Sequence, residues 1–319
     1  MKPIGGFFEL DLPGGDSFYH DQALALSTGR ACMGLLLSEL LPSKVYIPYY
    51  SCAALFEPLQ ERNISFEFYK INEALELADA ITLQDGEYLV YINYFGLKEA
   101  YSSSLQSLYK DQLILDNTHA FFKKQPGTGY SFTSARKYFG VADGAFLYGL
   151  KNSEGYNQLE RFKKASVAHS VNRLLGNQQE AFRLFQQYEQ SLDCSVLRIS
   201  SLSEKILSSI DYQAVRAQRK ANFDFLEKEL HQLNELQWNA KNTDAFCYPF
   251  LPKIPLAKTD FYKEQIFVPT LWPDVLERAD VESFTAAKKL TKDLLPLPID
   301  HRYTTTDMAR IVSFIRSKS

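Results

Sequence analysis

Short apolar runs, rich in β-branched and aromatic residues, alternate with amphipathic stretches through the first half of the 319-residue chain. The apolar runs predict strands at residues 45–47, 65–70, 88–94, 113–116 and 145–150. The amphipathic stretches between them predict helices at residues 30–41, 53–62 and 102–109. Strands that alternate with helices are typical of βαβ units, so we expect an α/β fold with a mostly parallel sheet.

The pattern changes near residue 157, where strand signals nearly vanish and charged residues recur with Leu, Phe and Ile at helical spacing up to residue 236. Long helices that bridge two domains would show this pattern. In the tail, residues 246–251 and 265–269 predict strands, and residues 283–290 and 306–317 predict helices. We therefore predict a large α/β domain over residues 1–200, bridging helices over 157–236, and a small C-terminal α+β domain over 201–319.

Composition narrows the classes of partner. With 45% hydrophobic and 23% charged residues, the chain has ample material for a buried core. Its net charge of −3 comes from 35 basic and 38 acidic residues spread along the sequence, without the basic stripe that nucleic acids or anionic membranes require. We therefore expect neither nucleic acid nor a membrane among its partners.

Cysteine usage and the N-terminal sequence indicate the compartment. The four cysteines, at positions 32, 52, 194 and 247, are far apart and form no CxxC pair, so neither a disulfide framework nor a zinc site is predicted. Residues 1–12 lack the continuous apolar stretch of a signal peptide, and no segment has the length of a membrane span. We expect a soluble, cytoplasmic protein without a bound metal.

A candidate phosphate site lies just before the first predicted helix, in the sequence Ser27-Thr28-Gly29-Arg30-Ala31. The first turn of a helix leaves backbone N–H groups unpaired at the positive end of the helix dipole, where a phosphate can bind. An ordinary helix cap by Ser27 or Thr28 would produce the same sequence and is the more common arrangement.

Two more candidates lie at the end of the predicted strand 113–116. Asp116 closes this apolar run, and ligands of open α/β sheets bind at the carboxyl ends of the strands. Its carboxylate could keep a pyridine nitrogen protonated by charge pairing. His119 follows in the sequence and would face the same side. The alternatives are a helix cap or turn residue for Asp116 and a core or surface histidine for His119.

The sequence over residues 130–140 combines hydroxyl groups with a lysine. Lys137 lies on a short connection between two strands, where an amine beside other cationic groups can become a nucleophile toward carbonyl compounds. Ser134, just before it, could form a hydrogen bond with a phosphate. Taken alone, Lys137 would be an ordinary solvated lysine.

The order of these parts resembles the DegT/StrS-type family of fold type I enzymes, which use pyridoxal 5'-phosphate (PLP). The family pattern is a Ser-Gly-Thr helix start, a Val-Pro-Ser-x-Thr segment, an acidic strand end written Asp-Ala-Ala-Gln-Ala, and a Ser-Phe-x-x-x-Lys turn. The matching segments, in the same order, are residues 28–30, 47–51, 116–120 and 131–137. The tail is also similar to the family's C-terminal part, at residues 219–223, 267–273 and 297–303.

The resemblance implies a role for each residue near the cofactor ring. Lys137 would hold PLP as a Schiff base and then move protons between the substrate carbon and the cofactor. Asp116 would pair with the pyridine nitrogen and preserve the electron sink. His119 stands where the family usually has Gln near the phenolic oxygen, Cys52 where it commonly has a ring-stacking aromatic residue, and Asn93 is expected to point toward the same site.

For the phosphate, the resemblance implies a site at the start of the first helix. After Thr28, the backbone amides of Gly29 and Arg30 would bind the phosphate oxygens. Either Ser131 or Ser134 would help, and the choice stays open because this chain has one extra residue before the lysine.

The family mostly aminates nucleotide-linked keto-sugars. The resemblance therefore implies a PLP-dependent aminotransferase that takes an amino group from glutamate or glutamine. Lys137 argues against the family's dehydratase branch, which has His at that position. Two alternatives stay open: a homologue with a binding or regulatory role, and a different PLP reaction such as elimination or decarboxylation. Because fold type I enzymes generally complete each active site with residues of a partner, a homodimer is also implied.

Overall fold

The computed structural model describes residues 10–15, 17–125, 129–150, 154–238 and 244–318. Within these ranges seven strands form one sheet, in the spatial order β1-β7-β6-β5-β4-β2-β3. The strands are β1 (Leu24–Leu26), β2 (Lys44–Pro48), β3 (Ser65–Tyr69), β4 (Glu87–Ile92), β5 (Leu113–Asp116), β6 (Tyr130–Ser134) and β7 (Ala145–Tyr148). Strands β3, β2, β4, β5 and β6 are parallel, whereas β7 is antiparallel to β6 and β1. The predicted α/β fold is confirmed.

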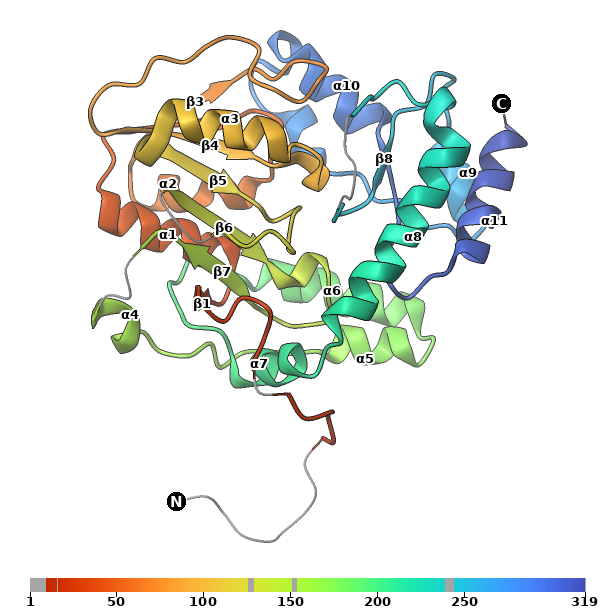
Figure 1. Cartoon of the computed structure of the whole chain (residues 1–319), viewed down its shortest axis with the longest axis horizontal. Helices are drawn as coiled ribbons and strands as arrows, with labels where there is room; N and C mark the ends of the chain where they lie inside the picture. Colours follow the sequence, from red (N-terminus) through yellow and green to blue (C-terminus); the bar gives the residue numbers. More distant parts are fainter. Residues whose placement is uncertain (1–9, 16, 126–128, 151–153, 239–243, 319) are drawn as a thin grey trace, which may run out of the picture.

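Helices lie around this sheet (Figure 1). The first half of the chain contributes α1 (Gly29–Leu40), α2 (Glu57–Glu61) and α3 (Glu99–Tyr109), with the 3₁₀ helices η1 (Ala53–Leu55), η2 (Tyr94–Gly96), η3 (Lys110–Gln112) and η4 (Ala135–Lys137). The predicted helices 30–41 and 102–109 are confirmed with small shifts of their ends. The predicted helix 53–62 is divided at Phe56, which joins η1 to α2.

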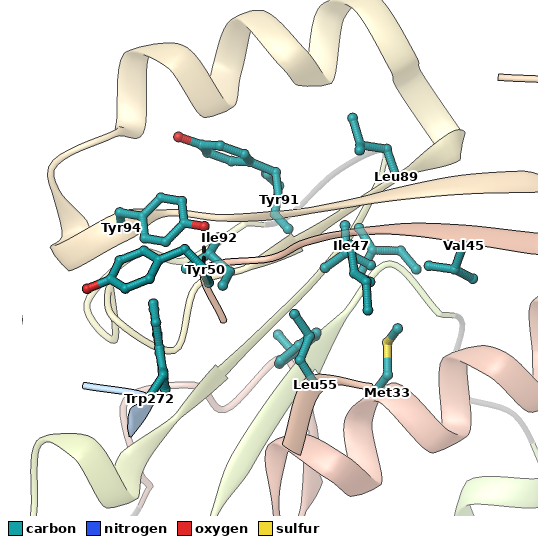
Figure 2. Packing of buried hydrophobic residues seen from close by; sticks show 14 of the residues in the cluster. Met33, Val45, Ile47, Tyr50, Leu55, Leu89, Tyr91, Ile92, Tyr94 and Trp272 are labelled. Carbon is teal, nitrogen blue, oxygen red and sulfur yellow. Dashed lines mark hydrogen bonds between the residues drawn. The ribbon is translucent and has the colours of Figure 1, made fainter. Parts of the chain in front are cut away.

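The main core packs on both faces of the sheet, as parallel strands between helices require. Figure 2 shows Met33 of α1 on one side of the strands and Tyr91 of β4 on the other, where its ring meets Tyr101 of α3 at 5.2 Å. Val45 and Ile47 of β2 are completely buried. Each such side chain contributes roughly 1.5–3 kcal/mol to folding by leaving water. This core holds the strand ends, and the residues that follow them, in place.

Strand β6 is not predicted by the hydrophobic pattern. Its sequence, Tyr-Ser-Phe-Thr-Ser, carries hydroxyl groups along its length and is similar to a polar turn. Its backbone nevertheless pairs with β5 on one side and with β7 on the other. Ser131, Thr133 and Ser134 are all buried as a result. Tyr, Phe and Thr favour strands, and pairing on both sides makes this hydroxyl-rich segment a central strand.

Between the sheet and the C-terminal part, the described residues form α4 (Glu154–Gln158), α5 (Ala168–Leu174), α6 (Gln178–Gln190) and α7 (Ser201–Ser208), followed by the long helix α8 (Tyr212–Leu230). Helices make up most of the described residues 157–236, as predicted, but residues 159–167 and 191–200 are not helical. The bridging role of the helices stays a prediction. None of the helices in the described ranges combines the length and the apolarity needed to cross a membrane.

The C-terminal part has an apolar cluster of its own. After α8 come η5 (His231–Leu233), β8 (Tyr248–Phe250), α9 (Lys258–Lys263), η6 (Pro273–Glu277), η7 (Val281–Ser283), α10 (Thr285–Asp293), β9 (Leu295–Leu297) and α11 (Thr305–Arg316). Buried side chains from α8, both strands, α9 and α11 contact one another there, among them Phe223, Tyr248, Phe261, Leu297 and Met308. The domain boundary at residue 200 stays a prediction.

One predicted strand in the tail is wrong, and one strand there was not predicted. Residues 265–269 do not form a strand: Gln265 has a φ of +56°, and Ile266 and Val268 are buried in the C-terminal cluster without a ladder partner among the described residues. The alternation of buried and exposed residues in this segment therefore reflects packing against the C-terminal cluster and not strand pairing. Strand β9 is instead an unpredicted element that pairs antiparallel with β8, and its Pro296 is opposite Pro249. Proline is tolerated there because both strands are edges.

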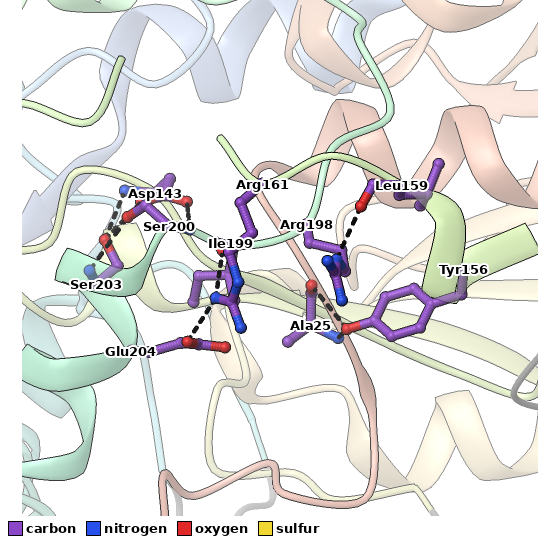
Figure 3. A network of polar contacts seen from close by, with 10 residues as sticks. All are labelled: Ala25, Asp143, Tyr156, Leu159, Arg161, Arg198, Ile199, Ser200, Ser203 and Glu204. Atoms are coloured by element: carbon purple, nitrogen blue, oxygen red, sulfur yellow. Dashed lines mark hydrogen bonds and ion pairs between the residues drawn. The ribbon is translucent and has the colours of Figure 1, made fainter. Parts of the chain in front are cut away.

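A buried carboxylate attaches α7 to the loop before β7 (Figure 3). Asp143 accepts hydrogen bonds from the Ser200 N–H at 2.7 Å and from the hydroxyls of Ser200 and Ser203, each at 2.5 Å. Burial raises the pKa of this carboxyl above its ordinary value, although the serine hydrogen bonds act in the opposite direction. Nearby, Arg161 pairs with Glu204 at 2.5 Å, and both side chains are partly exposed.

Asp143→Ala is expected to lower the free energy of unfolding by about 3 kcal/mol, because hydrogen bonds to a charged group are lost and buried donors are left unpaired. Glu204→Gln is the matched control from the same network. A partly exposed ion pair contributes about 0–1 kcal/mol, so this variant should be close to the parent. Urea denaturation measures both values, and equal losses in the two variants would contradict the assignment of Asp143 as the anchor.

Candidate active site

Lys137 lies on the turn between β6 and β7, at the end of η4. The turn is held by a hydrogen bond from the Ala135 N–H to the Gly144 carbonyl, and Gly144 has a φ of +125°, which strongly favours glycine. The Lys137 Nζ lies 5.6 Å from the ring centroid of Phe246. The side chain is partly exposed, and among the described residues it forms no hydrogen bond or ion pair.

Asp116 lies beside Lys137, because β5 and β6 are parallel neighbours whose carboxyl ends meet at one edge of the sheet. Its carboxylate is buried, and its Oδ1 accepts a hydrogen bond of 2.8 Å from the Thr118 N–H. Burial raises the pKa of Asp116, while the bond from Thr118 and the Lys137 ammonium act to lower it. The structure thus brings these two sequence-predicted residues together.

His119 is completely buried in the same cluster. Its ring stacks on Phe246 with centroids 4.5 Å apart and on Trp272 at 5.6 Å. Nδ1 accepts a hydrogen bond of 3.3 Å from the Phe95 N–H, whereas Nε2 is buried and has no partner among the described residues. Burial, followed by the Lys137 ammonium, holds the pKa of His119 well below its ordinary value. The imidazole is therefore neutral and has an unused N–H donor at Nε2.

The start of α1 opens toward this edge of the sheet. Thr28 is the helix cap, and its side chain accepts a hydrogen bond of 3.1 Å from the Ala31 N–H. The N–H groups of Gly29 and Arg30 have no acceptor among the described residues. A Cβ added at Gly29 would lie 3.7 Å from the ring of Phe132 in β6. The helix cap by Thr28 is therefore confirmed, the next two amides are free to bind a ligand, and the phosphate site stays a prediction.

Strand geometry separates the two candidate serines of β6. Side chains two residues apart on a strand share a face, so Ser134 is on the same face as Phe132, which lies beside Gly29. Ser131 is on the opposite face, where its hydroxyl is buried without a partner. The Ser134 hydroxyl forms no helix-capping hydrogen bond. This geometry favours Ser134 as the serine that faces the start of α1.

The remaining predicted residues are placed as follows. Cys52 is at the start of η1, and the residue is partly exposed. Burial of its thiol raises the pKa of that group. The charged groups of Lys137, Asp116 and Arg30 act on the thiol electrostatically. The Arg30 guanidinium is paired with Glu57.

Asn93 follows β4 and is buried. Both ends of its side-chain amide have protein partners: Nδ2 donates to Asn117 Oδ1 at 3.2 Å, and Oδ1 accepts from the Lys98 N–H at 3.0 Å. Asn93 lies next to Asp116, but both ends of its side-chain amide are already paired with other residues of the protein.

Sequence reasoning missed three aromatic residues that contact His119 or its neighbours. Phe246 contacts both His119 and Lys137, the Tyr138 hydroxyl donates to the His119 carbonyl at 2.7 Å, and Phe95 supplies the backbone N–H described above. No local pattern marks these residues as neighbours of His119, and Phe246 in particular is distant from it in sequence. Among the described residues, no group of His, Cys, Asp or Glu side chains could hold a metal ion.

Comparison with known proteins identifies the fold. Among solved structures, similar chains include one assigned as a sugar aminotransferase, Spr1654 from Streptococcus pneumoniae in its PMP form, with a TM-score of 0.67, 13% identity and coverage of 92% of this chain and 87% of that chain. The sugar aminotransferase CalS13 from Micromonospora echinospora has a TM-score of 0.63, 14% identity and coverage of 93% and 88%. This chain has the fold of the sugar aminotransferases.

A third similar structure is GDP-4-keto-6-deoxymannose-3-dehydratase with a trapped PLP-glutamate geminal diamine, at a TM-score of 0.65, 13% identity and coverage of 93% of this chain and 91% of that chain. No protein-family model matches the sequence. A search of curated proteins also gives no match. At such low identity the likeness concerns the fold, and the chemistry has to be argued from the residues of this chain.

Proposed function

We propose that this protein is a PLP-dependent aminotransferase that transfers an amino group from glutamate or glutamine to a keto-sugar, in particular a nucleotide-linked one. The observation that carries the proposal is the cluster of Lys137, Asp116 and the unpartnered Nε2 of His119 at one edge of the sheet. These three residues offer an amine, a carboxylate and an N–H donor to a single ligand.

The residues present fit PLP. His119 Nε2 is a buried donor that lacks an acceptor, and the phenolic oxygen of PLP is an acceptor of the kind it needs. The free amides of Gly29 and Arg30 suit a phosphate at the start of a helix. Burial raises the pKa of Asp116, so a cationic pyridine nitrogen beside it would stabilise its charged form.

When bound, PLP supplies an electron sink for charge that develops on the substrate carbon. Asp116 would hold the proton on the ring nitrogen. Lys137 would hold the cofactor through Nζ and then move a proton at that same atom, since no other protein group among the described residues occupies it. Trp272 and Phe246 would exclude water on the His119 side of the site.

The substrate class is supported by the names of the similar structures, which include two sugar aminotransferases and a dehydratase named for a GDP-linked keto-sugar. The S. venezuelae protein DesV, in complex with a ketimine intermediate, is also similar, with a TM-score of 0.63, 15% identity and coverage of 92% of this chain and 84% of that chain. Lys137 separates this chain from the dehydratase branch, for which sequence resemblance implies His. The four described cysteines are free, which supports a reducing compartment such as the cytoplasm.

Transfer of nitrogen from ¹⁵N-labelled glutamate or glutamine tests the proposal. Purified protein is incubated with PLP, the labelled donor and a panel of keto-sugar nucleotides, and mass spectrometry detects labelled amino-sugar. We expect label in at least one acceptor. Cofactor absorbance without turnover would favour a binding or regulatory protein instead. Products that lack the transferred nitrogen would favour elimination or decarboxylation.

Ser134→Ala is expected to weaken PLP binding about tenfold or more, because a hydrogen bond to a charged phosphate contributes about 1.5–3 kcal/mol. Ser131→Ala is the matched control, since this serine is on the other face of β6 and should leave affinity within about threefold. Fluorescence or absorbance titration with PLP measures both constants. A larger loss in the Ser131 variant would reverse the assignment.

We also propose a homodimer, supported by an apolar face on α5 and α6. Exposed large side chains occur on these two consecutive helices and on the first residue after α5: Val171, Leu174, Leu175, Phe182 and Phe185. Monomeric proteins rarely expose apolar side chains in such groups. The ion pair between Arg136 and Glu189 of α6 joins this face to the turn of Lys137, so a partner bound here would lie near the site.

Leu174→Glu is expected to shift the protein from dimer to monomer, because an unpaired charge would be buried at the proposed interface. Leu174 is 84% exposed in the single chain, so folding should be unaffected. Leu108→Glu on α3 is the control, since Leu108 is 68% exposed away from α5 and α6. Sedimentation velocity distinguishes the species. A parent protein that is already monomeric would contradict the homodimer.

A further inference from the structure

The turn between β4 and α3 has an unusual backbone. Phe95 has a φ of +58° and Gly96 a φ of +74°. Glycine adopts this left-handed region readily, but a residue with a side-chain ring rarely does, and such residues cluster where function requires them. Here the conformation directs the Phe95 N–H at His119 Nδ1, at 3.3 Å, and the Phe95 carbonyl at the Phe246 N–H, at 2.8 Å.

His119 is held by its backbone carbonyl and by its ring, and of the groups that contact it Phe246 is also hydrogen-bonded to the turn. Its backbone carbonyl accepts the Tyr138 hydroxyl at 2.7 Å. Its ring is nearly parallel to those of Phe246, at 11°, and Trp272, at 6°. A Cβ on Gly96 would lie 2.7 Å from the His119 carbonyl oxygen, a distance that real Cβ atoms do not tolerate. The absence of a side chain at position 96 is therefore required for this arrangement.

A neutral imidazole carries one proton, on one of its two nitrogens. Because the Phe95 N–H is a donor, Nδ1 must accept and the proton must be on Nε2. Nε2 is the buried atom that lacks a partner. A protonated ring would put an N–H at Nδ1 against the Phe95 N–H and would also lie near the Lys137 ammonium, the charged group that acts on it electrostatically.

We infer that the Phe95–Gly96 turn is a positioning element that fixes His119 as the Nε2–H tautomer, so that the ring presents a neutral donor to an anionic oxygen of the ligand bound at Lys137. This inference rests on the proposed function for the identity of that ligand. Phe95 and Gly96 act through His119 and have no contact of their own with the ligand. The consequence is a donor whose strength does not change across the range where histidines ordinarily titrate.

Nuclear magnetic resonance of the protein without cofactor tests the tautomer directly. In ¹⁵N-histidine-labelled protein, long-range proton–nitrogen spectra should show His119 with its proton on Nε2, unchanged between about pH 5 and 8. His119→Phe, which keeps an aromatic ring but has no ring nitrogen, assigns the signal. A proton on Nδ1, or a titration near the ordinary histidine pKa, overturns the inference.

Variants of the Phe95–Gly96 turn test whether the turn positions His119. Gly96→Ala should change the His119 nitrogen signals, because the methyl group displaces the His119 carbonyl. Gly140→Ala is the matched control, since its Cβ would meet only Ser170 atoms at 3.6 Å and beyond, and it should leave the signals unchanged. Unchanged signals in a folded Gly96→Ala protein overturn the role of the turn. If that variant does not fold, the parent spectrum still decides the tautomer.

The two hypotheses fail separately. With PLP added, His119→Gln keeps an N–H donor and should retain affinity within about threefold, whereas His119→Phe should lose about tenfold or more. Equal affinities in the two variants overturn the donor role. A Lys137 adduct in a protein whose His119 titrates ordinarily would sink this inference and leave the proposed function standing. The expected tautomer in a protein that never binds PLP would do the reverse.

Discussion

Lys137→Ala is expected to abolish covalent capture of PLP and to lower amino transfer by about 10³-fold or more. Removal of a group that moves protons in the reaction typically costs about 10²–10⁴-fold, and this lysine would also hold the cofactor. Among the described residues its amine is free of hydrogen bonds and ion pairs, so the substitution breaks no polar contact of the fold. The variant should therefore lose cofactor capture and amino transfer, while its free energy of unfolding stays close to that of the parent.

The measurement is borohydride reduction of the PLP-loaded protein, followed by mass spectrometry of its peptides. The parent should carry the added mass on Lys137, and the variant should carry none. Lys123→Ala is the matched control, because Lys123 is a partly exposed lysine paired with Glu99. Label on another lysine, or equal labelling of the Lys137 variant, would refute the central assignment.

Asp116→Asn is expected to lower the rate of amino transfer by about 10²–10³-fold while the covalent adduct on Lys137 persists. Loss of one member of a buried charge pair costs about 3–5 kcal/mol, and each 1.4 kcal/mol is a factor of ten in rate. Asn keeps the size of the side chain, and its oxygen can still accept the Thr118 N–H. The substitution therefore tests the charge and leaves the strand end intact.

Steady-state kinetics of the Asp116 variant should show the loss in kcat, with borohydride labelling of Lys137 retained. Asp111→Asn provides the control, because Asp111 is exposed in η3, just before the same strand begins. If the Asp116 variant kept the parent rate, a charge pair with the ring nitrogen would be excluded, whatever the result for Lys137.

Much of the fold could be predicted from local patterns. Strand β5 has its predicted bounds, and α1 begins at Gly29 after its cap Thr28, because period and capping are encoded by neighbouring residues. The failures share one cause. β6 forms because it pairs with β5 on one side and β7 on the other, β9 forms because the distant strand β8 pairs with it, and residues 265–269 lack such a partner among the described residues. Pairing between distant segments leaves little trace in a local window.

The candidate site shows the same division. The sequence by itself determined which chemical groups are available: an amine at Lys137, a carboxylate at Asp116 and a capped helix start at Thr28, each marked by its own neighbourhood. The tertiary structure alone put Ser134, rather than Ser131, on the face of β6 whose Phe132 lies beside Gly29, and left His119 a free donor while its ring stacks on Phe246 and Trp272. Those outcomes depend on strand register and on packing between residues far apart in the chain, which no local pattern encodes.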